Sequence, residues 1–326
     1  MKRTVSVLVA IVIMLSISTV FAAGGKLTLY SSQPDQDAAR TVAEYQKRHP
    51  DVSVQIFRSG TTEVMNKLTA EFAAGDPKPD VLLIADVVSM ERLKQDGRLL
   101  PHPGADVRAY SPETYDRERT YFGTKLITTG IVYHTAAKSR PGSWADLADP
   151  VRKGQLIMPS PLYSGAAAIT LGVLSRYADL GWRFFEQLKA NEAVAVRGNG
   201  AVLKAVASGE KSYGVLVDFM ALNAKAKGSP VEFVLPKEGV TAVTEPVAIL
   251  KTTRNPEAAR AFVDFLLSEE GQRLAASQGY LPAHTAVPPP PGFPKPGDVK
   301  FLPMDAAAIL STMPADLKRF ADLFGR

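Results

Sequence analysis

Strand-like and helix-like segments alternate along the first hundred residues, and this order restricts the possible folds more than any other feature. Strands are expected at 26–32, 52–57 and 80–85, with helices at 35–48 and 64–72 between them. The third strand is a continuous apolar run, which is typical of a parallel sheet covered on both faces. The order predicts an α/β lobe whose ligand-binding loops lie at the carboxyl ends of its strands.

A second set of alternating segments begins near residue 125. The apolar, β-branched run 125–134 is interpreted as a crossover into a second lobe, and a strand near 248–250 as the return. We therefore expect a discontinuous first lobe, 24–125 and 246–326, and a second lobe, 126–245. Two strands then cross between the lobes, an arrangement that suits a hinge closing on a ligand.

Residues 1–23 have the composition of a secretory signal peptide. A basic start precedes an apolar run from Val5 to Phe21, and small residues follow that run. An uncleaved membrane anchor is the alternative, but hydroxyl residues dilute the run and no basic stop-transfer segment follows it. We expect cleavage near Ala22 or Ala23 and a mature protein in the periplasm.

The sequence contains no cysteine, which excludes disulfides, a thiol metal site, a catalytic thiol and lipid attachment through an N-terminal cysteine. We therefore expect a freely diffusing monomer. The formal net charge of +5 is spread without basic runs, so it indicates a mild preference for anions and no nucleic-acid-binding surface. A chain of 326 residues is long enough to build two hydrophobic cores without disulfides.

Three segments place small or hydroxyl residues between a strand end and a helix start. They are Ser59-Gly60-Thr61-Thr62, the stretch from Ser160 to Ser164-Gly165-Ala166, and Arg197-Gly198-Asn199-Gly200. A helix start presents unpaired N–H groups and partial positive charge, while serine and threonine add hydroxyl donors. Plain N-capping explains any one such segment. Their occurrence on both expected lobes predicts an anion between them, with Arg197 either a clamp on phosphate or carboxylate or a surface residue.

Other candidate ligand-binding residues lie at the ends of apolar strands. Asp218 could accept from a ligand amine, a sugar hydroxyl or a metal, or simply cap the next helix. Asp86 is a similar case in which capping is favoured. Ser31 and Ser32 end the first strand and could line the cleft. No metal site and no cofactor are expected.

The residue patterns of common catalytic sites are missing. The four histidines lie far apart, without a His-x-x-x-His pair. The Gly-x-Ser-x-Gly, Walker and Gly-x-Gly-x-x-Gly motifs are absent too. We therefore expect a binding protein and not an enzyme, with a periplasmic enzyme of similar fold as a remote alternative.

Several stretches of the chain resemble a known family. They are Leu27–Ser32, Ala85-Asp86, Gly130–Tyr133, Ser143–Leu147, Ser160–Ala166 and Asn255–Gln272. Together they resemble the extracellular solute-binding proteins of the ferric-iron-binding type, which include binders of sugar phosphates and of phosphonates such as 2-aminoethylphosphonate. The resemblance covers essentially the whole mature chain. It implies a type II periplasmic binding fold, with two α/β lobes joined by a two-strand hinge, and an inner-membrane ABC permease as partner.

The resemblance also bears on the ligand. Iron-binding members hold a synergistic anion on a Ser-Gly-Ala turn, which Ser164-Gly165-Ala166 matches. Their adjacent tyrosines correspond here to Phe219-Met220, neither of which offers a hard oxygen ligand to Fe³⁺. The expected ligand is therefore a small anionic solute, a phosphonate or an organic phosphate. A ferric-ion-binding protein that uses Tyr163, Asp218 and Glu245 with a bound anion is the alternative.

Overall fold

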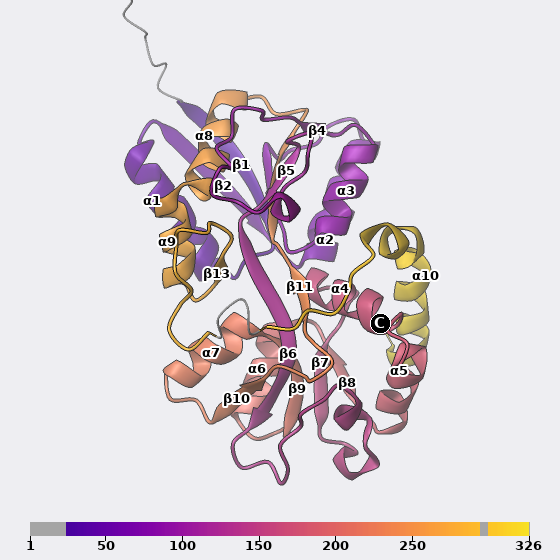
Figure 1. Ribbon diagram of the computed structural model, residues 1–326. Helices are drawn as coiled ribbons and strands as arrows, with labels where there is room; N and C mark the ends of the chain where they lie inside the picture. Colours follow the sequence, from indigo (N-terminus) through magenta and orange to yellow (C-terminus); the bar gives the residue numbers. More distant parts are fainter. Residues whose placement is uncertain (1–23, 294–298, 326) are drawn as a thin grey trace, which may run out of the picture.

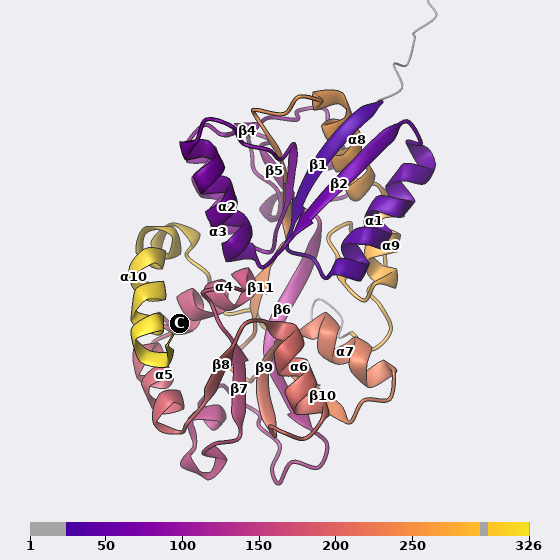
Figure 2. The same cartoon turned by 180° about the vertical axis from the view of Figure 1, so that it is seen from behind.

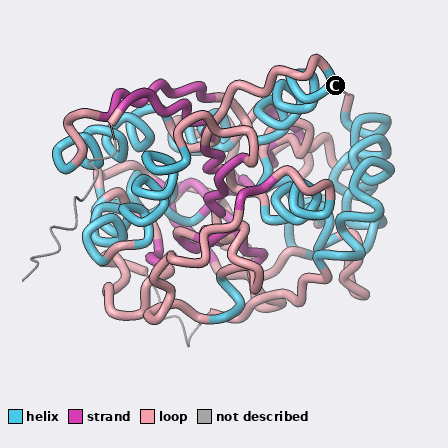
Figure 3. The backbone as a smooth tube through the Cα atoms, turned by 90° about the horizontal axis from the view of Figure 1, so that it is seen from above, coloured by secondary structure: helices cyan, strands magenta, loops and turns pink. Residues whose placement is uncertain are grey.

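The computed structural model describes residues 24–293 and 299–325, so the expected signal peptide lies outside the described residues. The described chain forms two α/β lobes, one above the other in Figure 1, and Figure 2 shows them from behind. Seen from above, helices surround the strands (Figure 3). No helix in the two described ranges is long and apolar enough to cross a membrane. The prediction of two α/β lobes is confirmed.

The first lobe is built on a sheet with the strand order β2-β1-β3-β12-β4, and β5 also pairs with β12. The first three of these strands are parallel, and β12 joins them antiparallel. Its strands are β1 (Gly25–Ser31), β2 (Val52–Arg58), β3 (Val81–Leu83), β4 (Leu99–Leu100), β5 (Tyr121–Gly123) and β12 (Pro246–Leu250). Its helices are α1 (Asp35–Arg48), α2 (Thr61–Ala73), α3 (Val87–Gln95), α8 (Pro256–Leu267) and α9 (Glu269–Ser277), with a 3₁₀ turn η1 (Pro112–Thr114).

Both faces of this first sheet are covered by helices, as its apolar strands predicted. Leu29 and Leu83 point into a core with α1 and α8. Their neighbours Tyr30 and Leu82 point the other way, into a core with α2 and α3. Figure 1 shows α1 and α8 on one side of the sheet and α2 and α3 on the other. This two-sided packing fixes where each strand ends, and therefore where the loops above the sheet lie.

The second lobe is built on a sheet with the strand order β10-β6-β9-β7-β8. Strands β7, β8 and β9 run parallel to one another, and β6 is antiparallel to β9. The short strands β11 and β13 also pair antiparallel with β6. Its strands are β6 (Lys125–His134), β7 (Leu156–Pro159), β8 (Val194–Val196), β9 (Tyr213–Val217), β10 (Val231–Val234), β11 (Thr241–Val243) and β13 (Leu281–Pro282). Its helices are α4 (Gly165–Leu174), α5 (Gly181–Ala190), α6 (Asn199–Ala207) and α7 (Asp218–Ala226), with 3₁₀ turns η2 (Ala145–Ala148) and η3 (Pro150–Arg152).

Two segments cross side by side between the lobes, as the sequence predicted. One joins β5 to β6, and the other joins β11 to β12. The backbone N–H of Thr124 donates to the carbonyl of Thr244 at 3.1 Å, and the Thr124 hydroxyl donates to the carbonyl of Glu245 at 2.8 Å. The amide of Gln272 donates to the carbonyl of Thr124 at 2.7 Å. The crossing segments are therefore tied to each other and to α9.

The C-terminal helix α10 (Ala306–Phe324) packs against both lobes. The expected division put all of 246–326 with the first lobe, and α10 contacts α3 of that lobe. Ile309 and Phe320 of α10 also share a core with α4 and α5 of the second lobe. The physical reason is that α4 is buried all round and needs an apolar cover, which the stripe on α10 provides.

Candidate ligand-binding site between the lobes

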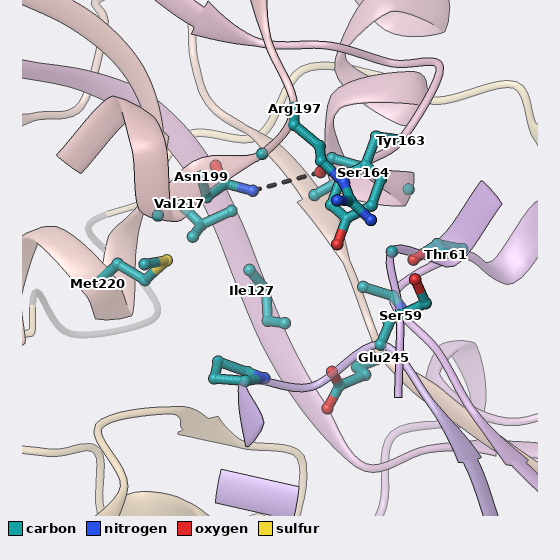
Figure 4. Close-up of a pocket in the computed structure, with 18 of the residues that line it drawn as sticks. Ser59, Thr61, Ile127, Tyr163, Ser164, Arg197, Asn199, Val217, Met220 and Glu245 are labelled. Atoms are coloured by element: carbon teal, nitrogen blue, oxygen red, sulfur yellow. Dashed lines mark hydrogen bonds between the residues drawn. The ribbon is translucent and has the colours of Figure 1, made fainter. Parts of the chain in front are cut away.

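A cavity of about 550 Å³ lies between the two lobes. Its walls are the loops after β1, β2 and β3 in the first lobe and those after β7, β8 and β9 in the second. These are carboxyl ends of strands, where α/β proteins bind their ligands. Figure 4 shows side chains of both lobes around this space, with Ile127 of β6 in its middle.

Among the helices that start at the cavity wall, α2, α4 and α6 follow the three predicted segments. Their N-caps are Gly60, Ser164 and Gly198. Glycine suits two of these caps, because a Cβ at Gly60 would clash with the Tyr163 ring at 2.5 Å, and one at Gly198 would make a tight contact with it at 3.1 Å. The Tyr163 ring therefore sits between the starts of α2 and α6. Close approach of these loops brings helix starts from both lobes to one cavity.

The starts of α4 and α6 contact each other through side chains. Ser164 Oγ caps α4 by accepting from the N–H of Ala167 at 3.3 Å, and it accepts from Asn199 Nδ2 at the same distance. Among the described residues, the buried Asn199 Oδ1 has no hydrogen-bond partner. In these first turns the N–H of Ala167 donates to Ser164 Oγ and that of Ala201 to the carbonyl of Gly198, while the remaining N–H groups have no intrahelical acceptors. The cavity therefore presents backbone donors beside a side-chain amide.

An ion pair joins the two lobes at the cavity rim. Arg197 Nη2 lies 2.9 and 3.0 Å from the two carboxylate oxygens of Glu63 on α2. The guanidinium also stacks on Tyr163, 4.6 Å from the ring centre. The Ser59 hydroxyl donates to the same carboxylate. The hydrogen bond from Ser59, together with Arg197, holds the pKa of Glu63 below its usual range, so Glu63 stays ionised.

A second polar cluster lies where the crossing segments meet the cavity. Glu245 Oε2 is 2.6 Å from Lys125 Nζ and accepts from Gln33 Nε2 at 3.3 Å. Both side chains of the ion pair are buried, with 3% of Lys125 and 2% of Glu245 exposed. Burial raises the pKa of Glu245, and the charge of Lys125 opposes that rise. Lys125 Nζ also lies 4.2 Å from the ring centre of Tyr280, which lines the cavity.

The structure brings most of the predicted ligand-binding residues to the cavity wall. Those that line it are Ser32, Ser59, Gly60, Thr61, Ser164, Gly165, Ala166, Arg197 and Asn199. The predicted residues Ser31, Asp86, Ser160 and Asp218 are not part of its lining. The three helix-start segments therefore meet, as the sequence predicted, while the strand-end residues mostly do not.

The residues away from the cavity have local structural roles. Asp86 caps α3 and accepts from the N–H groups of Val88 and Ser89. Ser31 is fully buried, and its Oγ accepts from the N–H of Gln33. Ser160 closes a turn by accepting from a backbone N–H two residues later. For Asp86 the structure therefore matches the capping alternative.

Asp218 anchors α7 to β6. Its Oδ2 accepts from the N–H and the hydroxyl of Thr128 at 3.0 and 2.7 Å, and its Oδ1 accepts from the N–H of Phe219 at 2.7 Å. The side chain is buried, and this burial raises its pKa to about 6. Three of its acceptor positions are therefore taken by the protein, and Asp218 does not line the cavity, so the geometry does not support the suggested role in holding a ligand amine, hydroxyl or metal.

The raised pKa of Asp218 gives a prediction on stability. Because its pKa is near 3.8 unfolded and about 6 folded, the folded protein holds an extra proton between about pH 4 and 6. The contribution of Asp218 to the free energy of unfolding therefore falls as the pH rises through this window. We expect Asp218→Asn to reduce the difference in unfolding free energy between pH 4.5 and 7.5 by up to about 3 kcal/mol. Urea unfolding at both pH values measures this, and an unchanged difference would contradict it.

Sequence reasoning missed several residues of the cavity region, among them Arg58, Tyr280 and Lys125. Arg58 lines the cavity and donates through Nε to the carbonyl of Gln33 at 2.6 Å. Tyr280 lines it from just before β13. Lys125 lies behind Glu245 and is the only charge in the apolar run 125–133, which was a usable signal for a buried partner.

Comparison with known proteins agrees with this architecture. The chain matches the family described as bacterial extracellular solute-binding protein over residues 30–273. It is 25% identical to a probable ABC transporter periplasmic-binding protein of Sinorhizobium fredii over 272 residues, which cover 78% of this chain and 74% of the relative.

Solved structures share the fold. The periplasmic binding protein AfuA from Actinobacillus pleuropneumoniae, solved with fructose-6-phosphate, matches with a TM-score of 0.83 and 21% identity, covering 92% of this chain and 98% of that one. Iron-bound HitA from Pseudomonas aeruginosa matches with a TM-score of 0.78 and 23% identity, covering 90% and 99%. These likenesses confirm the predicted type II periplasmic binding fold. Because the family match spans most of its length, the chain belongs to the bacterial extracellular solute-binding proteins.

Proposed function

We propose that the chain is the periplasmic solute-binding component of an ABC transporter, and that it captures a small phosphonate or organic phosphate and delivers it to the inner-membrane permease. One observation carries the choice of ligand. The starts of α2, α4 and α6, from both lobes, meet at one cavity. Each start carries about half a positive charge, and although Thr62 of α2 already donates to the carbonyl of Tyr163, the first-turn N–H groups that remain suit a phosphoryl group.

The side chains around these helix starts support an anionic ligand. Ser164 and Thr61 add hydroxyl donors beside the first-turn N–H groups. Ser164 Oγ accepts from the N–H of Ala167 and from Asn199 Nδ2, which leaves its single O–H free to donate to a ligand.

The geometry favours an organic anion over ferric ion. Of the residues in the ferric alternative, Tyr163 and Glu245 line the cavity, while Asp218 is bound to Thr128 and Phe219. Glu245 is already paired with Lys125. Among the described residues, no group of three or more His, Asp or Glu side chains is placed to hold a metal. Fe³⁺ would therefore find few of the hard oxygen ligands it prefers.

A role in transport and not in catalysis also fits the cavity. No histidine lines it, so within the described residues it lacks the usual general base. The family and the structural neighbours are binding proteins of transport systems. A turnover assay on phosphate esters that detected hydrolysis would contradict this part of the proposal.

Calorimetry on the purified protein tests the ligand class. The screen contains 2-aminoethylphosphonate, hexose phosphates, inorganic phosphate and ferric citrate. We expect at least one phosphonate or phosphate ester to bind, and Ser164→Ala to weaken that binding about 10- to 100-fold, because a hydrogen bond to a charged group contributes about 1.5 to 3 kcal/mol.

A matched serine separates binding from helix capping. Ser268 caps α9 by accepting from the N–H of Gly271 at 3.1 Å, away from the cavity. Ser268→Ala should cost a similar ~1 kcal/mol of stability and leave the affinity unchanged. Equal affinities in Ser164→Ala and wild type would show that the proposed anion site is wrong. A tyrosinate-to-iron colour after ferric loading, with no binding of any phosphate, would favour the ferric alternative.

A further inference from the structure

The cavity has a second polar end, formed by a carboxylate on a crossing segment. Glu245 lies between β11 and β12 and lines the cavity. Its Oε2 contacts Lys125 and Gln33, while Oε1 receives no hydrogen bond from the described part of the chain. An ionised carboxylate has about four lone-pair sites, so Glu245 keeps acceptor capacity after both contacts.

Glu245 is held in a backbone conformation that non-glycine residues rarely adopt. Its φ is +36°, and the hydroxyl of Thr124 donates to its carbonyl at 2.8 Å. Such a conformation costs on the order of 1 to 3 kcal/mol and persists where the surroundings enforce it, most often at ligand-binding positions. The strained backbone is therefore a second sign, independent of the cavity lining, that Glu245 has a functional position.

Two neighbours favour the ionised form of this carboxylate and hold it in place. Lys125 lies at 2.6 Å and supplies the opposite charge that a buried carboxylate needs. Gln33, 1% exposed, turns its NH₂ group to Glu245, which leaves Gln33 Oε1 without a partner among the described residues. A second unfilled acceptor thus lies on a residue that contacts Glu245.

The starts of α4 and α6 lie on one side of an apolar middle, and Glu245 lies on the other. Figure 4 shows Asn199 and Ser164 on one side of Ile127 and Glu245 on the other. Val217 and Met220 extend the apolar part of the wall. A solute that fills this space therefore meets donors at one end, carbon in the middle and acceptors at the far end.

We propose that Glu245 forms a subsite that accepts a hydrogen bond from a donor group of the solute, with Lys125 and Gln33 as its positioning residues. The solute then carries a hydroxyl or ammonium group, separated by a short carbon segment from its phosphoryl or phosphonyl group. This inference rests on the proposed function and narrows its solute class. An ammonium and a hydroxyl group share the donor chemistry, and the experiment below distinguishes them.

Three phosphonates that differ in one terminal group test the subsite. Ethylphosphonate, 2-hydroxyethylphosphonate and 2-aminoethylphosphonate share the anion and differ in a terminal methyl, hydroxyl or ammonium group. Calorimetry on the wild type should show at least one donor-bearing phosphonate binding 10-fold or more tighter than ethylphosphonate. Preference for the amine identifies a cationic end, and equal gains for both identify a neutral donor.

Variants of two carboxylates in the cavity wall test whether Glu245 causes the preference for a donor-bearing phosphonate. Glu245→Gln should bring the ratio of affinities close to one, and the double variant Lys125→Met with Glu245→Gln, which buries no unpaired charge, should do the same. Asp35→Asn is the matched control. Asp35 also lines the cavity, but its side chain is 82% exposed, and its carboxylate lies 3.9 Å from Arg58 Nε. It should keep the wild-type ratio.

The outcomes separate this inference from the proposed function. Equal binding of all three phosphonates by the wild type overturns the subsite and leaves the anion site standing. A preference that survives in Glu245→Gln and in the double variant also overturns it. Failure of the wild type to bind any phosphonate or phosphate ester removes both proposals together.

Discussion

Replacing Gly165 with alanine is expected to weaken solute binding about 10- to 100-fold while both lobes remain folded. Gly165 starts α4 in the second lobe, and a Cβ there would lie 2.5 Å from the carbonyl oxygen of Ala85 and 2.8 Å from Thr61 Oγ1. Both of these atoms belong to the first lobe. The added methyl group therefore acts as a wedge between the lobes, and the overpacking costs about 1 to 3 kcal/mol in the closed state. We expect the clash to be absent when the lobes move apart.

Gly200 provides the matched control. It lines the same cavity in the first turn of α6, and a Cβ there would meet no atom within 4 Å. Gly200→Ala should therefore bind as the wild type does. Calorimetry gives the affinities, and small-angle X-ray scattering should show a decrease in the radius of gyration on ligand addition for wild type and Gly200→Ala only. Wild-type affinity in Gly165→Ala would contradict the close approach of the lobes.

Replacing Lys125 with methionine is expected to lower the free energy of unfolding by about 3 to 5 kcal/mol. The variant leaves the carboxylate of Glu245 buried, with 2% exposed, and removes the charge 2.6 Å away. Without Lys125, nothing offsets the cost of burying the charged carboxylate, so Glu245 must either take up a proton or disturb the packing around it. The crossing segments should be the first region affected, because Glu245 is tied to Thr124.

Urea unfolding followed by circular dichroism measures this effect. The double variant Lys125→Met with Glu245→Gln should recover most of the loss, because it removes both charges together. Lys318 is the surface control: its pair with Asp322 is 2.6 Å long, but both side chains are more than 60% exposed. Lys318→Met should change stability by less than about 1 kcal/mol. A loss below that size in Lys125→Met would contradict the importance of the buried pair.

The sequence predicted the lobes well because their signal is local. Each strand of the first sheet shows its apolar pattern within a few residues, and the cores on the two faces follow from that alternation. The segment Ser164-Gly165-Ala166 was predicted at the site for a similar reason. A hydroxyl residue and a glycine between a strand and a helix lie at the carboxyl end of that strand, where the cavity forms.

The rest depends on contacts between distant residues. Asp218 has the local pattern of a ligand-binding carboxylate, and only its pairing with Thr128 across β6 and β9 shows that it is occupied. The Lys125–Glu245 pair joins opposite ends of the second lobe in sequence, so spacing could not reveal it. The amphipathic pattern of α10 predicts a buried face and says nothing of which lobe buries it.

The place of α10 has a consequence for how the chain folds as it is made. The first sheet is incomplete until β12 inserts between β3 and β4, and the core of the second lobe lacks Ile309 and Phe320 until the last residues are available. Domains generally fold as units once their residues have been synthesised. Here both units wait for the C-terminal part of the chain, so a growing polypeptide stays without a finished core through most of its synthesis. Folding is therefore expected to be post-translational.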